Sequence, residues 1–178
     1  VGSEMCIRDR GATEYTDKVG DGAGVFKSTD RGNNWTQINN GLDSLETNIL
    51  TVDPNDSETL YLGTDDDGVY KSRDGGESWK KLTVSSLSKS FGVGDIIVDP
   101  QNSNNIYIGT VDYFRLSESR GVLGDFGVYK STDGGATWEE FNVGLNHLGV
   151  FSLELSEENR ILYAGTRAGG VYWISLDN

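Results

Sequence analysis

The fold is decided by the heptapeptide GVFKSTD at residues 24–30, because this stretch recurs along the chain. It returns as GVYKSRD at residues 68–74 and as GVYKSTD at residues 127–133. A fourth copy begins as GVY at residues 170–172 and then diverges at Trp173. Repetition of one segment at a regular spacing indicates a fold that is assembled from copies of one structural unit.

Two further segments recur upstream of the heptapeptide. LYLGT at 60–64 matches IYIGT at 106–110 and LYAGT at 162–166, and LTVDP at 50–54 matches IIVDP at 96–100. Each full unit therefore holds four short β-rich runs separated by turn residues, which in the second unit lie near 48–53, 59–64, 68–73 and 78–83. Once an insertion between Thr110 and Gly127 is discounted, the period is about 43 to 46 residues, which predicts four-stranded propeller blades.

The pattern Ser-x-Asp-x-Gly-x-x-Trp occurs three times, in register with the repeats. It resembles the Asp-box, or BNR, repeat of sialidase-like propellers, and the resemblance covers residues 24–178. Families that carry this repeat include sialidases, xyloglucan-cleaving propellers, sortilin ectodomains and the photosystem II assembly factor. The matching residues are Ser28, Asp30, Gly32 and Trp35, then Ser72, Asp74, Gly76 and Trp79, then Ser131, Asp133, Gly135 and Trp138.

The predicted fold class is all-β, a fragment of a β-propeller with about three blades present. Blade ends are expected near 11–42, 43–84, 85–145 and 146–178, which gives two strands of one blade, two full blades and three strands of another. Residues 1–10 share no pattern with the rest, resemble translated adaptor DNA and are excluded from the predicted fold. A closed ring needs more blades than these, so missing N-terminal blades are expected to close it.

The Asp-boxes are interpreted as structural elements. A short Asp side chain accepts hydrogen bonds from backbone N–H groups in a turn, Gly takes positive φ without a steric cost, and Trp supplies an apolar anchor. A catalytic role for these acids is the alternative, but the same Asp recurs in three blades. The resemblance agrees, because Asp-boxes lie on the propeller face opposite the active site.

Ligand contacts are expected on the loops that join second and third strands and on the loops between blades. The longest, Val111–Phe126, is either a tolerated surface insertion or a binding loop, and aromatic plus Arg side chains suit sugars, carboxylates or a protein. The acidic run Asp65–Asp67 reads as a solvated turn rather than a cation site, and His147 has no partner that the sequence can name. The candidate ligand-binding residues are Tyr113, Arg115, Arg120 and Arg167.

The composition excludes several classes of function. With 15 Lys and Arg against 28 Asp and Glu, the net charge of −13 argues against nucleic acid and against an anionic membrane surface as partners. No apolar run is long enough to insert into a membrane as a spanning helix. One Cys and one His exclude an internal disulfide, a Cys-rich zinc site and a multi-His metal site, so no metal and no cofactor are expected.

These observations predict a non-catalytic Asp-box propeller module that binds a glycan or a protein, secreted or periplasmic. No catalytic residue is assigned. The first alternative is a glycoside hydrolase of the sialidase or xyloglucanase-like type. A xyloglucanase-like enzyme would need two carboxylates on different blades, such as Asp65 and Asp125. The second is a propeller like the photosystem II assembly factor. An open array of blades also exposes strand edges, so the chain is expected to self-associate.

Overall fold

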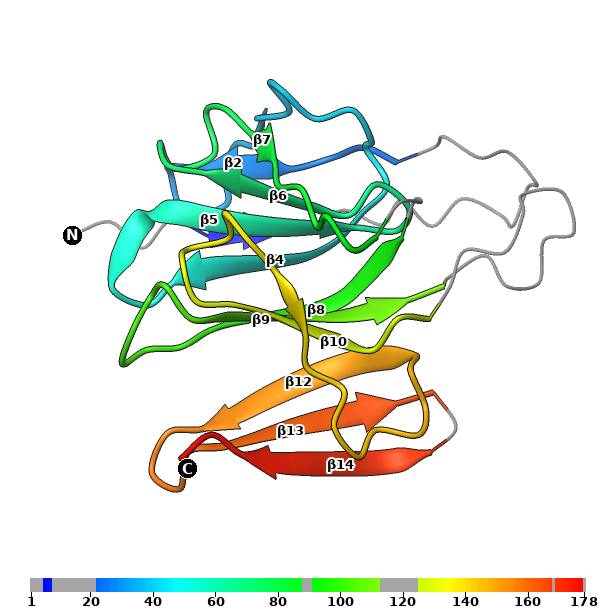
Figure 1. Cartoon of the computed structure of the whole chain (residues 1–178). Helices are drawn as coiled ribbons and strands as arrows, with labels where there is room; N and C mark the ends of the chain where they lie inside the picture. The colour runs from blue at the N-terminus through cyan, green and yellow to red at the C-terminus, as the bar shows by residue number, and fades with distance from the viewer. Residues whose placement is uncertain (1–4, 8–21, 88–90, 113–124, 168, 178) are drawn as a thin grey trace, which may run out of the picture.

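The computed structural model describes residues 5–7, 22–87, 91–112, 125–167 and 169–177. These residues form four antiparallel sheets that stack face to face in sequence order (Figure 1). The first sheet is β1 (Met5–Ile7), β2 (Phe26–Ser28) and β3 (Thr36–Gln37). The second is β4 (Thr47–Asp53), β5 (Asp56–Thr64), β6 (Val69–Ser72) and β7 (Lys80–Lys81). The third is β8 (Gly92–Val98), β9 (Ile106–Val111), β10 (Val128–Ser131) and β11 (Glu139–Glu140), and the fourth is β12 (Val150–Ser156), β13 (Ile161–Thr166) and β14 (Gly170–Ser175).

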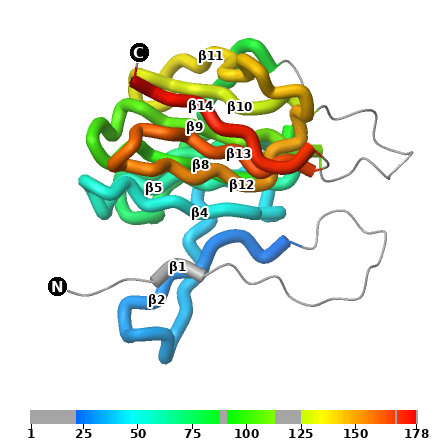
Figure 2. The backbone as a smooth tube through the Cα atoms, turned by 90° about the horizontal axis from the view of Figure 1, so that it is seen from below, coloured from blue at the N-terminus to red at the C-terminus, as the bar shows by residue number. Residues whose placement is uncertain are grey.

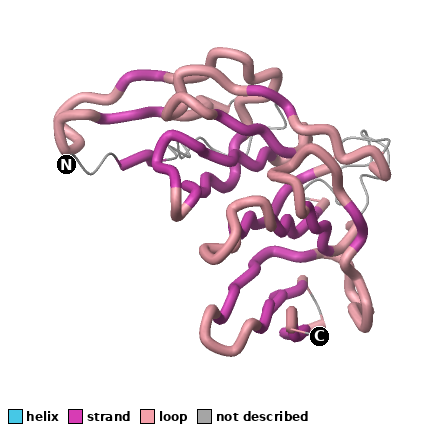
Figure 3. The backbone as a smooth tube through the Cα atoms, turned by 60° about the vertical axis from the view of Figure 1, so that its left-hand side comes forward, coloured by secondary structure: helices cyan, strands magenta, loops and turns pink. Residues whose placement is uncertain are grey.

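The second and third sheets confirm the predicted four-stranded blade. Each has its strands in chain order and joined by consecutive antiparallel pairs, and the described residues contain no helix (Figure 3). It follows that none of these residues forms a helix that could cross a membrane. The first strands β4, β8 and β12 contact one another in succession, which makes them the inner strands of the stack. The outer strands β7 and β11 are only two residues long, and both residues of each are exposed.

The first sheet differs from the expectation in one respect. Residues 1–10 were expected to take no part in the fold, yet Met5–Ile7 pairs with β2 as an antiparallel strand, with Cys6 opposite Lys27 (Figure 2). Residues 8–21, which separate this strand from the first repeat, lie outside the described residues. The pairing does not require a matching sequence, because the unpaired N–H and C=O groups at the edge of β2 form hydrogen bonds with the backbone of an extended segment.

The cores lie between neighbouring sheets. One cluster joins the first and second sheets through Val25, Tyr70 and Trp79, and another joins the second and third through Val69 and Val93. A third cluster, which includes Val128, Val150 and Leu162, joins the third and fourth sheets. In the third strands, apolar residues are adjacent and do not alternate with polar ones. Successive side chains point to opposite faces of the sheet, and each face packs against another sheet.

Glycine in the second strand allows neighbouring sheets to pack closely. A Cβ on Gly63 would lie 2.8 Å from the Cβ of Val93, and one on Gly109 would lie 2.6 Å from Cγ1 of Val150. Both distances are well inside van der Waals contact, so the first strand of the next sheet occupies the space of the missing side chain. The glycine of the LYLGT and IYIGT segments is therefore required by packing between sheets.

Polar contacts also join the sheets. The Nζ group of Lys27 donates to the carbonyl oxygen of Gly75 at 3.2 Å, and Lys71 donates in the same way to Gly134 at 2.9 Å. Both lysines stand at the same position of the heptapeptide, and both acceptors belong to the Asp-box turn of the following sheet. The lysine of one repeat is thus hydrogen-bonded to the turn of the next.

A buried ion pair joins the third and fourth sheets. Asp99 is fully buried, and both of its carboxylate oxygens accept hydrogen bonds from Arg160, at 2.9 and 2.6 Å. Burial opposes ionisation of Asp99, but the hydrogen bonds from Arg160 outweigh it, so the pKa of this carboxyl lies below its usual value. The pair lies at the turn between first and second strands, away from the loops that carry the candidate ligand contacts.

Candidate functional site

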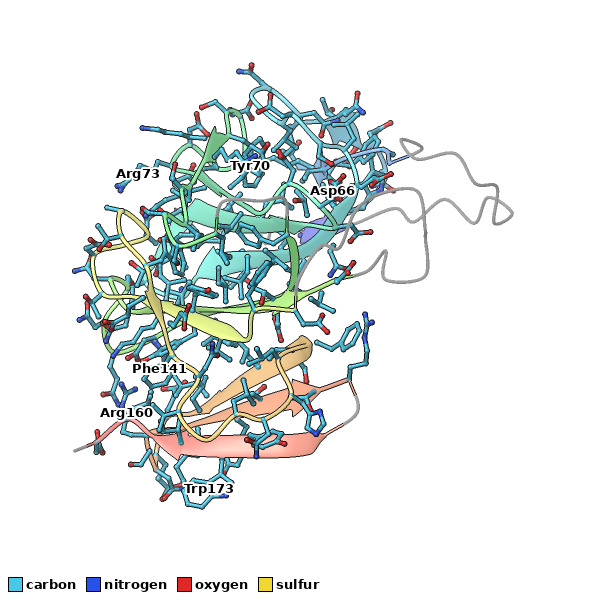
Figure 4. All side chains as sticks on the ribbon, turned by 45° about the vertical axis from the view of Figure 1, so that its right-hand side comes forward. Asp66, Tyr70, Arg73, Phe141, Arg160 and Trp173 are labelled. Carbon is cyan, nitrogen blue, oxygen red and sulfur yellow. The ribbon has the colours of Figure 1, made fainter. Side chains whose placement is uncertain are left out.

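The third strand of each sheet separates two kinds of turn. Asp65–Asp67 precede β6, and the Asp-box that contains Asp74 follows it. Figure 4 shows Asp66 and Arg73 at opposite ends of this strand with Tyr70 between them. Because β10 is flanked in the same way, the loops between second and third strands lie at one end of the sheets and the Asp-boxes at the other.

The Asp-boxes repeat one hydrogen-bond arrangement. Asp74 accepts from the hydroxyl of Ser72 at 2.6 Å, and from the backbone N–H and hydroxyl of Ser78 at 2.9 and 2.5 Å. Gly76, which has a φ of 93°, donates its N–H to the Ser72 hydroxyl oxygen at 2.9 Å. Asp30 and Asp133 accept equivalent bonds in their own turns. These carboxylates are engaged in closing turns.

The box tryptophans differ in their surroundings. Trp79 is 5% exposed and donates from Nε1 to the carbonyl oxygen of Ile38 in the preceding sheet, whereas Trp35 is 37% exposed. Trp35 and Trp138 donate to glycine carbonyls of their own turns instead, each at 3.2 Å. The sequence motif is the same in all three boxes, but the burial of its Trp depends on the neighbouring sheet.

The Asp-box hydrogen bonds lead to a prediction about how the stability of the fold depends on pH. They lower the pKa of Asp74 from 3.8 to about 2, with the Ser72 hydroxyl as the largest cause, followed by the hydroxyl and the N–H of Ser78. Because the folded pKa lies below the unfolded one, this stabilisation is complete above pH 3.8 and is lost as the pH falls towards 2. Asp74→Ala is therefore expected to lower the Tm at pH 6, and the gap to the wild type should close near pH 2.

Thermal melts of both proteins across this pH range measure the effect, and the exposed Glu157→Gln variant is the control for a simple change of charge. Ligand affinity of Asp74→Ala should equal that of the wild type, since the box lies at the far end of the strand from the loops. An unchanged Tm with abolished binding would reverse the structural assignment of the Asp-box.

The acidic loop of the second sheet is tied down by several contacts. Asp67 accepts from the hydroxyl of Tyr70 and forms an ion pair with Lys81. Asp66 accepts from the Ser44 hydroxyl at 3.2 Å, on the connection from the first sheet. The described residues contain no group of three or more His, Cys, Asp or Glu placed to hold a metal ion. The loop therefore presents fixed carboxylates at this end of the sheet.

The long loop of the third sheet is pinned at its base. The N–H of Asp112 donates to Asp125 at 2.9 Å, and the N–H of Phe126 donates to the hydroxyl of Thr110 at 3.0 Å. Asp112 is 2% exposed, which the sequence did not suggest. The only sequence signal for this burial was the position of Asp112 directly after a buried strand, with a second Asp at the other end of the insertion.

Arg167, a predicted ligand contact on the fourth sheet, also reaches the base of this loop. Its guanidinium donates to the backbone carbonyl of Asp112 and lies 5.1 Å from the centroid of the Phe151 ring. Arg167 thus links the loops of two neighbouring sheets, and the residue is still exposed to solvent. The other three candidates, Tyr113, Arg115 and Arg120, lie outside the described residues.

His147 lies on the connection between the third and fourth sheets and is exposed. Its ring centroid is 6.5 Å from that of Tyr172, so its neighbour is aromatic. The structure therefore gives His147 no described contact with a carboxylate that would orient it as a general base.

A polar cavity lies away from these loops. It has a volume of about 400 Å³ and is found at the Asp-box end, between the first and second sheets. Its lining includes Lys27, Asp30, Asn40 and Glu77. Lys27 and Glu77 form an ion pair of 3.7 Å across it. The cavity and the fixed carboxylates of the loops are at opposite ends of the sheets, so they do not form one site.

Comparison with known proteins identifies relatives of this chain. Residues 23–172 match the family model Sortilin-Vps10, described as sortilin, neurotensin receptor 3. The xyloglucanase Xgh74A of Acetivibrio thermocellus is 36% identical over 96 residues, which is 49% of this chain and 11% of that protein. The chain thus spans about a tenth of the length of that relative.

Solved structures also share the fold, among them two that superpose on most of this chain. An ancestral GH74 enzyme superposes with a TM-score of 0.65 and 24% identity, over 86% of this chain and 20% of its own. YCF48 from Cyanidioschyzon merolae superposes with a TM-score of 0.63 and 13% identity, over 88% of this chain and 46% of its own. At these identities the superpositions show that the sheets are arranged as in these proteins and nothing about activity.

Proposed function

The chain belongs to the Sortilin-Vps10 family of Asp-box β-propellers, and from this premise we propose that it forms part of a propeller that binds a polysaccharide of the xyloglucan type. The loops between second and third strands would form the binding surface. A polysaccharide ligand of this kind is met outside the cytoplasm, so the proposal includes a secreted or periplasmic location.

One observation carries the proposal. Three consecutive sheets bring polar groups to the same end, namely Asp66 and Asp67, then Asp125, then Arg167, and hydrogen bonds fix them there. Fixed carboxylate and guanidinium groups suit the many hydroxyl groups of a sugar chain, since each orientation is set before the ligand arrives. The xyloglucanase relative supports the choice of a glycan over a protein partner.

Tyr113, Arg115, Arg120 and Arg167 are the proposed ligand contacts. Alternate residues of an extended segment face the same side, so Tyr113 and Arg115 are proposed together and Phe114 between them is not. An aromatic ring stacks on a sugar face, and an exposed Arg donates several hydrogen bonds. Arg167 is the member of this group for which the structure shows a position, beside the base of the loop.

The double variant Tyr113→Ala with Arg115→Ala tests these contacts. We expect it to bind a xyloglucan oligosaccharide about tenfold or more weakly, a loss of roughly 1.4 kcal/mol or more, with an unchanged Tm. Isothermal titration calorimetry measures the affinity, and Arg73→Ala at the Asp-box end is the matched control. If the double variant binds as well as the wild type, this loop is not the site, and if the wild type binds no glycan, the ligand class is wrong.

Hydrolysis of the same polysaccharide is the second candidate function. The relative that matches at 36% identity is a xyloglucanase, and carboxylates from two neighbouring sheets, such as Asp65 and Asp125, occur on the proposed face. Release of reducing ends from xyloglucan by the wild type would support this candidate. Binding without any such release would leave the non-catalytic module as the function.

A further inference from the structure

The polar cavity at the Asp-box end lies between two sheets that both belong to this chain. Its volume of about 400 Å³ falls in the range of roughly 300–1,000 Å³ that is usual for small-molecule sites. Most of its lining comes from residues 27–40, and Glu77 comes from the Asp-box turn of the second sheet. Thr36, Asn40 and Glu77 are exposed, so the cavity opens to solvent beside the outer strand β3.

A sheet that preceded the first one would pack on the other face of that sheet. The second sheet meets the first through the carbonyl group of Gly75 and the ring of Trp79. The equivalent residues of the first Asp-box are Arg31 and Trp35, which a preceding sheet would contact in the same way. Neither of them lines the cavity. The cavity is therefore a feature of the interface between the first and second sheets and does not depend on what precedes them.

Short side chains leave this space open. The lysine bond described above joins the second and third sheets as it joins the first and second, so both pairs approach each other alike. Thr29 and Thr36 line the cavity, and the repeat places Arg73 and Lys80 at the same positions of the second sheet. On the facing turn, Glu77 corresponds to Ala136 of the third sheet. The first interface thus has two hydroxyl groups and a carboxylate where the next has two long cations and a methyl group.

The charged groups of the lining are partnered. Lys27 and Glu77 form an ion pair at 3.7 Å, in which the side chain of Lys27 is 13% exposed and that of Glu77 is 67% exposed. Both carboxylate oxygens of Asp30 accept hydrogen bonds inside their own turn, from Ser28 and Asn34. Because each of these three charges already has a partner, the cavity suits a neutral ligand better than an ion.

The other groups of the lining suit a molecule that is rich in hydroxyl groups. The hydroxyls of Thr29 and Thr36 each donate and accept, and the exposed carboxylate of Glu77 accepts. The side-chain amide of Asn40 donates to the carbonyl oxygen of Glu77 at 3.5 Å, a distance that a closer acceptor would improve on. Ile38 adds an apolar wall for the C–H groups of a sugar ring.

We propose that this cavity is a second glycan site, which binds one neutral hexose or pentose unit at the Asp-box end of the sheets. It lies at the opposite end from the loops of the proposed xyloglucan surface, so both sites can be occupied at once. The two sites share no residue. The inference therefore goes beyond the proposed function and does not depend on it.

Nuclear magnetic resonance titrations of the 178-residue chain with glucose, galactose, mannose and xylose test the proposal. At least one sugar should shift the backbone amide signals of Thr36, Asn40 and Glu77 to saturation. The signals of Ala136 and Glu139, at equivalent positions of the third sheet, should not move. Acetate and methylammonium are the charged probes. The proposal is overturned if no sugar shifts the three signals, or if a charged probe binds there more tightly than every sugar.

Thr29→Arg fills the cavity with the residue that the second sheet carries at the same position, Arg73. We expect the sugar to bind at least about tenfold more weakly, with an unchanged Tm, because the new side chain occupies the space of the ligand. Thr132→Arg is the matched control, since it makes the same change at the equivalent exposed position of the third sheet. Thr36→Lys, which copies Lys80, replaces Thr29→Arg if circular dichroism melts show that the latter is not folded.

The affinity of a folded cavity variant decides the assignment. If it equals that of the wild type, the cavity is not the site and the proposal fails. The double variant Tyr113→Ala with Arg115→Ala should keep the full affinity for the sugar at this cavity. Loss of xyloglucan binding in that variant, or its absence in the wild type, would leave the cavity result unchanged, so the two proposals fail separately.

Discussion

Arg160→Met is expected to lower the free energy of unfolding by about 3–5 kcal/mol, one of the two largest effects that the structure predicts for a single substitution. The change removes both hydrogen bonds that the guanidinium donates to Asp99. Asp99 is fully buried, so its carboxylate would be left without its ionic partner in a site that excludes water. The cost comes mainly from the charge that remains and not from the bond that is lost.

The double variant Arg160→Met with Asp99→Asn is the control for this explanation. It removes both charges, and we expect it to recover a large part of the stability that the single variant loses. Urea denaturation measures all three proteins. If the double variant is no more stable than Arg160→Met alone, the loss arises from packing of the Arg160 side chain, which is only 16% exposed, and not from the unpaired carboxylate.

Gly109→Ala is expected to destabilise the chain by about 1–3 kcal/mol, because the new methyl group would lie 2.6 Å from Cγ1 of Val150. Relief of this contact requires the third and fourth sheets to move apart. Gly165→Ala is the matched control at the equivalent position of the last sheet. There the nearest atom is the Ser152 hydroxyl oxygen, which rotates away. Equal losses in the two variants, measured by chemical denaturation, would show that the glycine is not required by packing between sheets.

The sheets could be predicted well because the sequence segments that form them are short and recur in each repeat. The heptapeptide and the LYLGT segment pair with each other in β6 and β5, and the same register returns in β10 and β9. Turn chemistry predicted the Asp-box bonds for a similar reason, since Ser72, Asp74 and Ser78 are close neighbours in the chain. Strand ends were less accurate, and β7 is shorter than the run near 78–83 suggested.

Contacts between sheets could not be predicted in this way. Arg160 and Asp99 are 61 residues apart in the sequence, and nothing near either residue indicates the other. Arg167 was expected to bind a ligand, and no feature of the sequence indicated that it also reaches the carbonyl of Asp112, 55 residues away. Because such pairs depend on how two sheets meet, they require the fold to be known first.

The lysine that reaches from one sheet to the turn of the next has a consequence for how such chains grow by gene duplication. Its acceptor is a backbone carbonyl, of Gly75 for Lys27 and of Gly134 for Lys71, so the bond depends on the shape of the turn. Every repeat that holds both the lysine and the Asp-box carries a donor for its successor and an acceptor for its predecessor. A tandem copy of such a repeat would therefore meet its new neighbours with matching groups at once, without any compensating mutation on either side.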